Sequence, residues 1–285
     1  MSYLRIKPDG TNCPNHIKLL PDGGHLPMLL ALQSLFVAPE TGLHSTNGCL
    51  WNYGDDFMPE DARAILHDKV MRLQQGAEGR HIAQLPETVD ARPMLDFHLI
   101  HKVQKPLGGF DDAEWEIVAP VFNRIFDDVM PAIDHIRANN GKIIGFNVDF
   151  FNRLPSDESD GALFDIHYDG STYPAIRVMI PLCPSPDMQT IVLDNDDVDA
   201  VSAPIYKKRE GYTKPDDLKN WLMEKFSPNA YGRMMPQKSV LFLTTCHAMC
   251  KPLAHGGPTF KWTDFNGQIH EADNRSLMTI HLKFR

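Results

Sequence analysis

The chain has 285 residues, of which 42% are hydrophobic and 23% charged, and its formal net charge is −9. These values are typical of a globular protein with a sizeable core, long enough for one large domain or two small ones. The sequence shows no repeat, low-complexity tract or linker, which favours one domain over residues 1–285. The acidic balance argues against nucleic acid as a partner, because phosphate binding calls for a surplus of Lys and Arg. The longest apolar run, residues 27–38, is too short to span a bilayer, so no membrane partner is expected.

The cysteines number five and are scattered along the chain, which predicts reduced thiols in a cytoplasmic protein. They are Cys13, Cys49, Cys183, Cys246 and Cys250. Cys246 and Cys250 flank His247, and His255 follows shortly after. Because thiolate and imidazole are the ligands that zinc prefers, a structural zinc site in this segment is one alternative.

The first half of the chain, residues 1–141, reads as mainly helical. Residues 27–38 are expected to form a buried helix. Apolar residues recur at helical spacing between Ala62 and Leu73 and stop before Gly76, which predicts an amphipathic helix.

A stronger helix is predicted over residues 111–140. Acidic residues occupy its first turn, an apolar stripe runs from Trp115 to Ile136, and Gly141 is the expected C-terminal stop. Pro120 and Pro131 are expected to kink or split this helix.

From Lys142 onward the apolar period changes to two, which predicts short, mostly antiparallel strands. The predicted strands are residues 142–152, 162–169, 174–182, 189–193, 238–245 and 275–284, with one helix at 214–226. Helices followed by strands give an α+β protein whose strands should close into a sandwich or barrel.

Alternation along the last predicted strand separates two faces. One face carries Met278, Ile280, Leu282 and Phe284, and the other carries Arg275, Leu277, Thr279, His281 and Lys283. By the same rule, His167 and Asp169 project from one side at the end of strand 162–169. Two potential metal ligands can therefore converge on one ion.

Two histidines and one carboxylate form the facial triad that holds Fe(II) and leaves open coordination positions. His167 and Asp169 would supply two of these ligands. The third must come from a later strand, where His247 and His255 are the candidates. His281 is a weaker candidate, since it shares a strand with Arg275.

The ordered set of His167-Tyr168-Asp169, His255 in LAHGGP and Arg275 in NRSLMTIHLKF resembles the 2-oxoglutarate and Fe(II)-dependent oxygenases. The phytanoyl-CoA hydroxylase-like and prolyl-hydroxylase-like branches of this superfamily are not distinguished. The resemblance covers residues 142–285. It implies a double-stranded β-helix, or jelly-roll, core that contains the metal site and is buttressed by helices from residues 1–141.

The resemblance also implies roles for the site residues. His167, Asp169 and His255 would hold Fe(II), with His247 as the alternative distal ligand. The separation of 20 residues between His255 and Arg275 is longer than in many members of the family. Arg275 would bind the far carboxylate of the cosubstrate 2-oxoglutarate through its planar, permanently charged guanidinium, and Ser276 or Thr279 would add a hydrogen bond.

Members of the family use O2 to couple decarboxylation of 2-oxoglutarate, which gives succinate and CO2, to oxidation of an unactivated C–H bond. Asp169 favours hydroxylation, because related halogenases carry a small residue at that position. Desaturation, epoxidation and ring formation stay open. The acidic balance favours a small polar metabolite as substrate, such as an amino acid or biosynthetic intermediate, and Arg177 is the residue expected to bind its carboxylate or phosphate.

Two other classes of function remain open from the residues alone. One is a cupin-like metalloenzyme, an isomerase or hydrolase, that uses the same ligands without 2-oxoglutarate. The other is a non-catalytic binding protein stabilised by zinc at Cys246, Cys250 and His255. Oligomeric state is not predicted.

Overall fold

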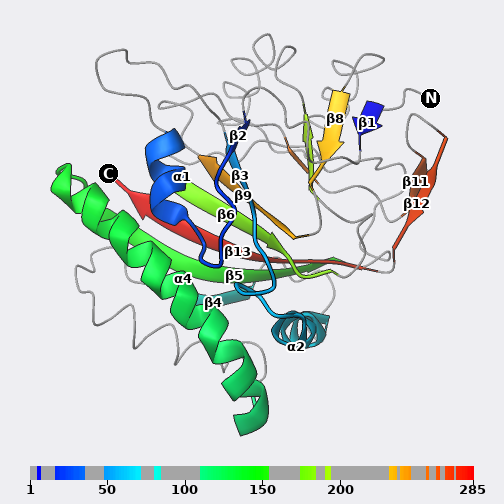
Figure 1. The fold of residues 1–285 in the computed structure, drawn as a ribbon, viewed down its shortest axis with the longest axis horizontal. Helices are drawn as coiled ribbons and strands as arrows, with labels where there is room; N and C mark the ends of the chain where they lie inside the picture. Colours follow the sequence, from blue (N-terminus) through cyan, green and yellow to red (C-terminus); the bar gives the residue numbers. More distant parts are fainter. Residues whose placement is uncertain are drawn as a thin grey trace, which may run out of the picture.

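Figure 1 shows the computed structural model, in which helices cover one side of a twisted sheet. The structure describes residues 5–7, 17–35, 48–71, 80–84, 110–153, 174–183, 190–193, 231–235, 238–244, 255–256, 261–263, 267–272 and 274–285. Within these ranges the chain forms a mixed fold of helices and strands, with one large sheet and one smaller sheet.

The large sheet has seven strands in the order β2-β3-β9-β6-β13-β5-β4. Their bounds are β2 (Ile17–Leu19), β3 (Gly48–Asn52), β4 (Arg80–Gln84), β5 (Ile143–Arg153), β6 (Ala175–Pro181), β9 (Ser239–Thr244) and β13 (Arg275–Phe284). β13 lies between β5 and β6 and is antiparallel to both. Pairing on both sides fixes its register, and with it the face on which each of its side chains lies.

The smaller sheet has the order β1-β8-β7-β10. Its strands are β1 (Arg5–Lys7), β7 (Ile191–Leu193), β8 (Tyr231–Met234) and β10 (His255–Gly256). β11 (Lys261–Thr263) and β12 (Ile269–Glu271) form a separate antiparallel pair.

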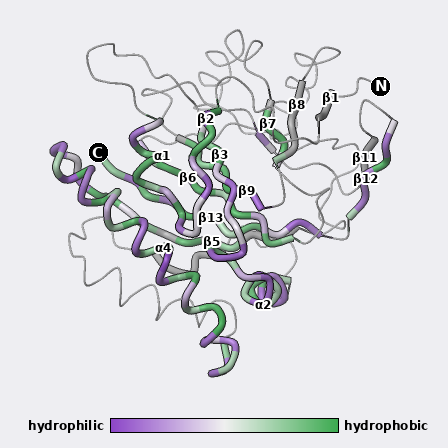
Figure 2. Tube along the Cα trace, viewed as in Figure 1, coloured by the Kyte–Doolittle hydropathy of each residue, from purple (hydrophilic) through white to green (hydrophobic). Residues whose placement is uncertain are grey.

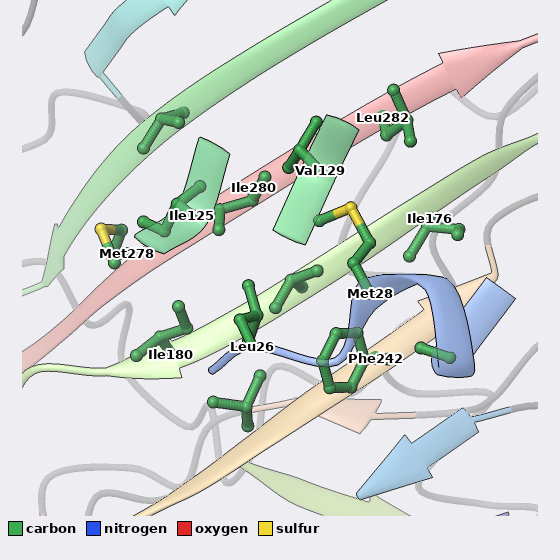
Figure 3. Packing of buried hydrophobic residues seen from close by; sticks show 14 of the residues in the cluster. Leu26, Met28, Ile125, Val129, Ile176, Ile180, Phe242, Met278, Ile280 and Leu282 are labelled. Carbon is green, nitrogen blue, oxygen red and sulfur yellow. The ribbon is translucent and has the colours of Figure 1, made fainter. Parts of the chain in front are cut away.

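Helices α1 (Met28–Leu35), α2 (Glu60–Met71) and α4 (Asp112–Ala138) confirm three of the predicted helices. Ile125 and Val129 of α4 pack against the apolar face of β13, and Met28 of α1 lies beside Ile176 and Phe242 (Figure 3). Each large side chain that is fully buried in this way stabilises the fold by about 1.5–3 kcal/mol. Figure 2 shows apolar and polar residues alternating along α4, as an amphipathic helix requires.

The start and end of α4 follow from local chemistry. Asp111 caps the helix by accepting a hydrogen bond from the Glu114 backbone N–H, and the Glu114 carboxylate accepts one from the Asp111 N–H. The helix runs through Pro120 and Pro131 without dividing, so the expected split is wrong. Beyond the C-terminus of α4, the residue with left-handed backbone conformation is Asn140, whose φ is 62°. Gly141 has no side chain, and any other residue would clash there, because its Cβ would lie 2.5 Å from a methyl carbon of Ile136.

A second apolar cluster lies on the other face of the large sheet. It joins Val192 of β7 and Met235 to Leu277 of β13 and Met179 of β6. Because β7 belongs to the smaller sheet, this inner face of the large sheet packs against the smaller one. The division of β13 into a helix-facing side and an inner side confirms the predicted alternation.

The strand predictions are confirmed at β5, β6, β7, β9 and β13. The predicted strand 162–169 and helix 214–226 lie outside the described residues. Strands β2, β3 and β4 come from a part of the chain that was expected to be mainly helical, and they extend both edges of the large sheet. None of the helices in the described ranges is both long and apolar enough to cross a bilayer.

The first turn of helix α1 is capped by a side chain from another helix, α4. Its first turn holds no acidic residue, and the backbone N–H of Met28 donates to the carboxylate of Asp128 on α4. A carboxylate suits this position because the first N–H groups of a helix carry positive partial charge. Burial between the helices nevertheless raises the pKa of Asp128 to about 8, and the hydrogen bond from Met28 only partly offsets this effect.

We therefore expect Asp128→Asn to change how stability depends on pH. Since the folded pKa lies above the unfolded one, the contribution of Asp128 is fully present below about pH 4 and is lost as pH rises through 8. The free energy of unfolding of the wild type should fall relative to Asp128→Asn between pH 5 and 8, by at most about 1.4 kcal/mol per pH unit. Urea unfolding at several pH values measures this difference.

The matched control is Asp134→Asn, on the exposed side of α4. The free energy of unfolding of this variant should change with pH in the same way as that of the wild type. If the free energies of unfolding of the wild type and Asp128→Asn change with pH in parallel, the raised pKa of Asp128 is contradicted.

Candidate active site

Part of the predicted metal site cannot be placed. His167, Asp169 and the alternative ligand His247 lie outside the described residues, as do Cys246 and Cys250. In the part of the chain that the structure describes, no three His, Cys, Asp or Glu residues are grouped so that they could hold a metal ion. The described part of the predicted site consists of His255, Arg275 and their neighbours.

His255 begins β10 in the smaller sheet and is 1% exposed. It pairs with Val192 of β7, and Gly256 pairs with Ile191. Pairing with β7 therefore fixes the position of His255 in the smaller sheet.

Arg275 is the first residue of β13 and is 5% exposed. Its Nη2 atom lies 3.5 Å from the hydroxyl oxygen of Thr190, the residue that precedes β7. Val192, the partner of His255, lies two residues further along, or about 7 Å in an extended chain. The segment 190–192 thus connects Arg275 in one sheet to His255 in the other.

Thr190 was not predicted as a site residue. It is 2% exposed, and its carbonyl accepts a hydrogen bond of 3.0 Å from the Met235 backbone N–H, so its position is fixed by the backbone. The sequence shows only a threonine before a short apolar strand. Its proximity to Arg275 arises from the packing of the two sheets.

Thr279 and Ser276 lie on opposite faces of β13. Thr279 is 4% exposed and shares the inner face with Arg275, four residues or about 13 Å along the strand. Ser276 alternates with Arg275, and its hydroxyl lies 3.5 Å from the Asn274 amide nitrogen on the helix-facing side. This geometry does not favour Ser276 as a partner of Arg275 toward one ligand.

Arg177 lies on the inner face, as the alternation of β6 predicts. It pairs in register with His281 of β13 on one side and with Leu243 of β9 on the other. Both Arg177 and His281 are half-buried, whereas Lys283, two residues further along, is exposed. The inner face therefore carries a basic pair about six residues, or roughly 20 Å, from Arg275.

Helix α2 contacts the end of β6 beside the start of β13. The Arg63 guanidinium donates to the Leu182 carbonyl at 2.6 Å and to the Glu60 carboxylate at 2.8 Å. The hydrogen bond to Arg63 lowers the pKa of Glu60, so both groups stay charged near neutral pH. The hydrogen bond from Arg63 satisfies the buried Leu182 carbonyl and fixes α2 against the end of β6.

His67, also on α2, contacts Asn274, the residue that precedes β13. Its Nε2 atom lies 3.0 Å from the Asn274 amide nitrogen. Burial lowers the pKa of His67, an effect that Arg63 reinforces while the Asn274 contact and Asp68 oppose it. The side chain is therefore neutral at pH 7, and Nε2 can accept from the amide.

The two described cysteines, Cys49 and Cys183, are buried and form no disulfide, in agreement with the expected thiols. Burial raises the pKa of Cys49 to about 12, so its thiol is unreactive at neutral pH.

No protein-family model and no curated protein matches the chain. Solved structures are similar at low identity. A 2OG-Fe(II) oxygenase family oxidoreductase from Burkholderia pseudomallei is 11% identical, with 93% of this chain and 94% of that chain covered and a TM-score of 0.35. The non-haem α-ketoglutarate-dependent epimerase SnoN from nogalamycin biosynthesis is 11% identical, with coverage of 80% and 73% and a TM-score of 0.33.

A prolyl-4-hydroxylase from Pseudomonas putida is 9% identical, with 79% of this chain and 91% of that chain covered and a TM-score of 0.31. A TM-score below 0.5 does not establish a shared fold.

Proposed function

We propose that the protein is a non-haem Fe(II) and 2-oxoglutarate-dependent oxygenase in which residues 1–285 form one domain. The observation that carries the proposal is the approach of Arg275 to Thr190, next to the strand that pairs with His255. The family pattern requires a cationic anchor and a distal histidine to face one pocket. Here a buried arginine from the large sheet and a buried histidine from the smaller sheet are linked by the three residues 190–192, Thr190 and the first two residues of β7.

The strand order supports a jelly-roll core for this enzyme. β5, β13, β6 and β9 are neighbours in the large sheet, and β8, β7 and β10 are neighbours in the smaller one. Between β6 and β13 the chain changes sheet repeatedly, which is typical of two packed Greek keys. These would be seven of the eight strands of a jelly roll, and the predicted strand 162–169 would be the eighth.

The residues present fit the implied metal and cosubstrate. His255 is a buried imidazole, and Arg275 is a buried guanidinium beside a hydroxyl, which together suit a metal and a dicarboxylate. In our proposal His167, Asp169 and His255 hold Fe(II), which supplies O2 activation when 2-oxoglutarate is bound. Arg275 and Thr190 bind the far carboxylate of 2-oxoglutarate, so Thr190 takes the role expected for Ser276. Thr279 lies on the same face of β13 as Arg275, four residues further along the strand.

The substrate in this proposal is a small polar metabolite that carries an anionic group and is hydroxylated at an unactivated C–H bond. Arg177 supplies a permanent positive charge on the inner face, and His281 opposite it can add a second donor. Two basic residues placed directly opposite repel each other when both are charged, and a bound carboxylate or phosphate would relieve that repulsion.

Succinate formation tests the proposed function. With Fe(II), 2-oxoglutarate, O2 and a substrate found by screening, the wild type should release succinate, and Asp169→Ala and Asp169→Asn should reduce substrate-linked release at least about a hundredfold, because a metal ligand is lost. Substrate-linked succinate at the wild-type level in both variants would rule out Asp169 as a ligand. Turnover of a substrate without 2-oxoglutarate would instead favour the cupin-like alternative.

Metal content distinguishes the two distal histidines. We expect the anaerobically reconstituted His255→Ala variant to lose most of its bound Fe(II), and His247→Ala to retain it. Equal loss in Cys246→Ser and His255→Ala, with zinc as the bound metal, would favour the structural zinc site. Iron retained in His255→Ala but lost in His247→Ala would move the distal ligand to His247.

A further inference from the structure

The start of β13 is held from the helix-facing side. Asn274 and Ser276 flank Arg275, and both lie on the face opposite to it. The Asn274 amide nitrogen lies 3.0 Å from His67 Nε2 and 3.5 Å from the Ser276 hydroxyl. The amide nitrogen can only donate, so its two hydrogens serve His67 on α2 and Ser276, two residues further along the chain.

The end of β6 completes this arrangement. Pro181 has no N–H to donate to the ladder, and the next two residues supply the donors, since the N–H groups of Leu182 and Cys183 lie 3.0 and 3.4 Å from the Ser276 carbonyl. The Cys183 thiol donates to the Asn274 carbonyl at 3.2 Å. All of these groups except His67 are buried or nearly so.

We propose that His67 and Asn274 are positioning residues for Arg275, which hold the first residues of β13 in the register that directs the guanidinium toward Thr190. A strand end frays unless it is tied down, and Arg275 is the first residue of its strand. The hydrogen bond from His67 acts on Asn274, which in turn donates to Ser276, so the contact with α2 reaches the residues on both sides of Arg275 from the face opposite to its guanidinium. The inference rests on the proposed function, because it concerns the binding of 2-oxoglutarate by Arg275.

The test compares two ligands of the Fe(II)-loaded protein in the absence of O2. 2-Oxoglutarate has the distal carboxylate that Arg275 would bind, whereas 2-oxobutyrate has the same chelating 2-oxo acid without it. We expect His67→Ala and Asn274→Ala to raise the Kd for 2-oxoglutarate about five- to tenfold, the effect of losing one or two hydrogen bonds. The Kd for 2-oxobutyrate should stay within about twofold. His67→Gln, whose amide oxygen can accept in place of Nε2, should restore wild-type affinity.

His135→Ala, on the last turn of α4, is the matched control and should change neither Kd. Thermal unfolding of each variant verifies that it is folded at the temperature of the titration. In the Arg275→Ala background, His67→Ala should have no further effect on the Kd for 2-oxoglutarate, because the group that it positions is absent.

The outcomes separate the inference from the proposed function. If Arg275→Ala weakens 2-oxoglutarate binding and His67→Ala does not, the positioning role is wrong and the proposed function stands. Equal weakening of both ligands by His67→Ala would show a general structural role and would also overturn the inference. If the wild type binds no 2-oxoglutarate, the proposed function fails and the inference fails with it. If the wild type binds 2-oxoglutarate and Arg275→Ala leaves its affinity unchanged, Arg275 is not the anchor, and the inference fails while the proposed class of enzyme is not contradicted.

Discussion

The arrangement of this protein depends on the pairing of β13 with strands on both sides. The register with β5 and β6 is continuous over most of β13, and it decides which side chains meet the helices and which meet the smaller sheet. A slip of one residue would move Arg275 to the helix side and place Met278 and Ile280 between the sheets. The apolar contacts of α4 with β13 and the inward position of Arg275 are therefore two results of one register.

The helices stabilise that register from one side. α4 covers β13 with apolar residues such as Ile125 and Val129 (Figure 3). α2 makes polar contacts beside the start of the strand, because Arg63 donates to the Leu182 carbonyl and His67 contacts Asn274. Apolar burial supplies most of the stabilisation but specifies position loosely. The directional hydrogen bonds from α2 specify the strand end, next to the residue on which the proposed chemistry depends.

Local patterns in the sequence predicted a substantial part of the fold. The apolar stripe and acidic first turn of α4, and the two faces of β13, are properties of neighbouring residues, and both are confirmed. β3 and β4 were missed because these strands, one next to an edge of the sheet and one at an edge, are defined by pairing with distant segments. The cap of α1 was missed for the same reason, since Asp128 lies 100 residues from Met28.

The candidate site was predicted less completely. Arg275 and His255 were found from an ordered pattern, whereas Thr190 and the His67–Asn274 contact are visible only once the sheets and α2 are packed. The resemblance implied Ser276 or Thr279 as a hydrogen-bond donor next to Arg275, and Ser276 lies on the opposite face of β13 because neighbours along a strand alternate. The roles of His167, Asp169, His255, Arg275 and Arg177 in the site remain predictions.

The most direct test of the proposed chemistry is the visible charge-transfer absorption of the Fe(II) complex with 2-oxoglutarate, recorded without O2. The absorption should appear in the wild type, weaken in Arg275→Ala at subsaturating 2-oxoglutarate, and be unchanged in Lys283→Ala, an exposed cation on the same strand. If iron binds and no absorption develops with 2-oxoglutarate, or if Arg275→Ala and the wild type titrate alike, then Arg275 is not the anchor of this cosubstrate. The first of these results would mean that the site serves a different metal chemistry.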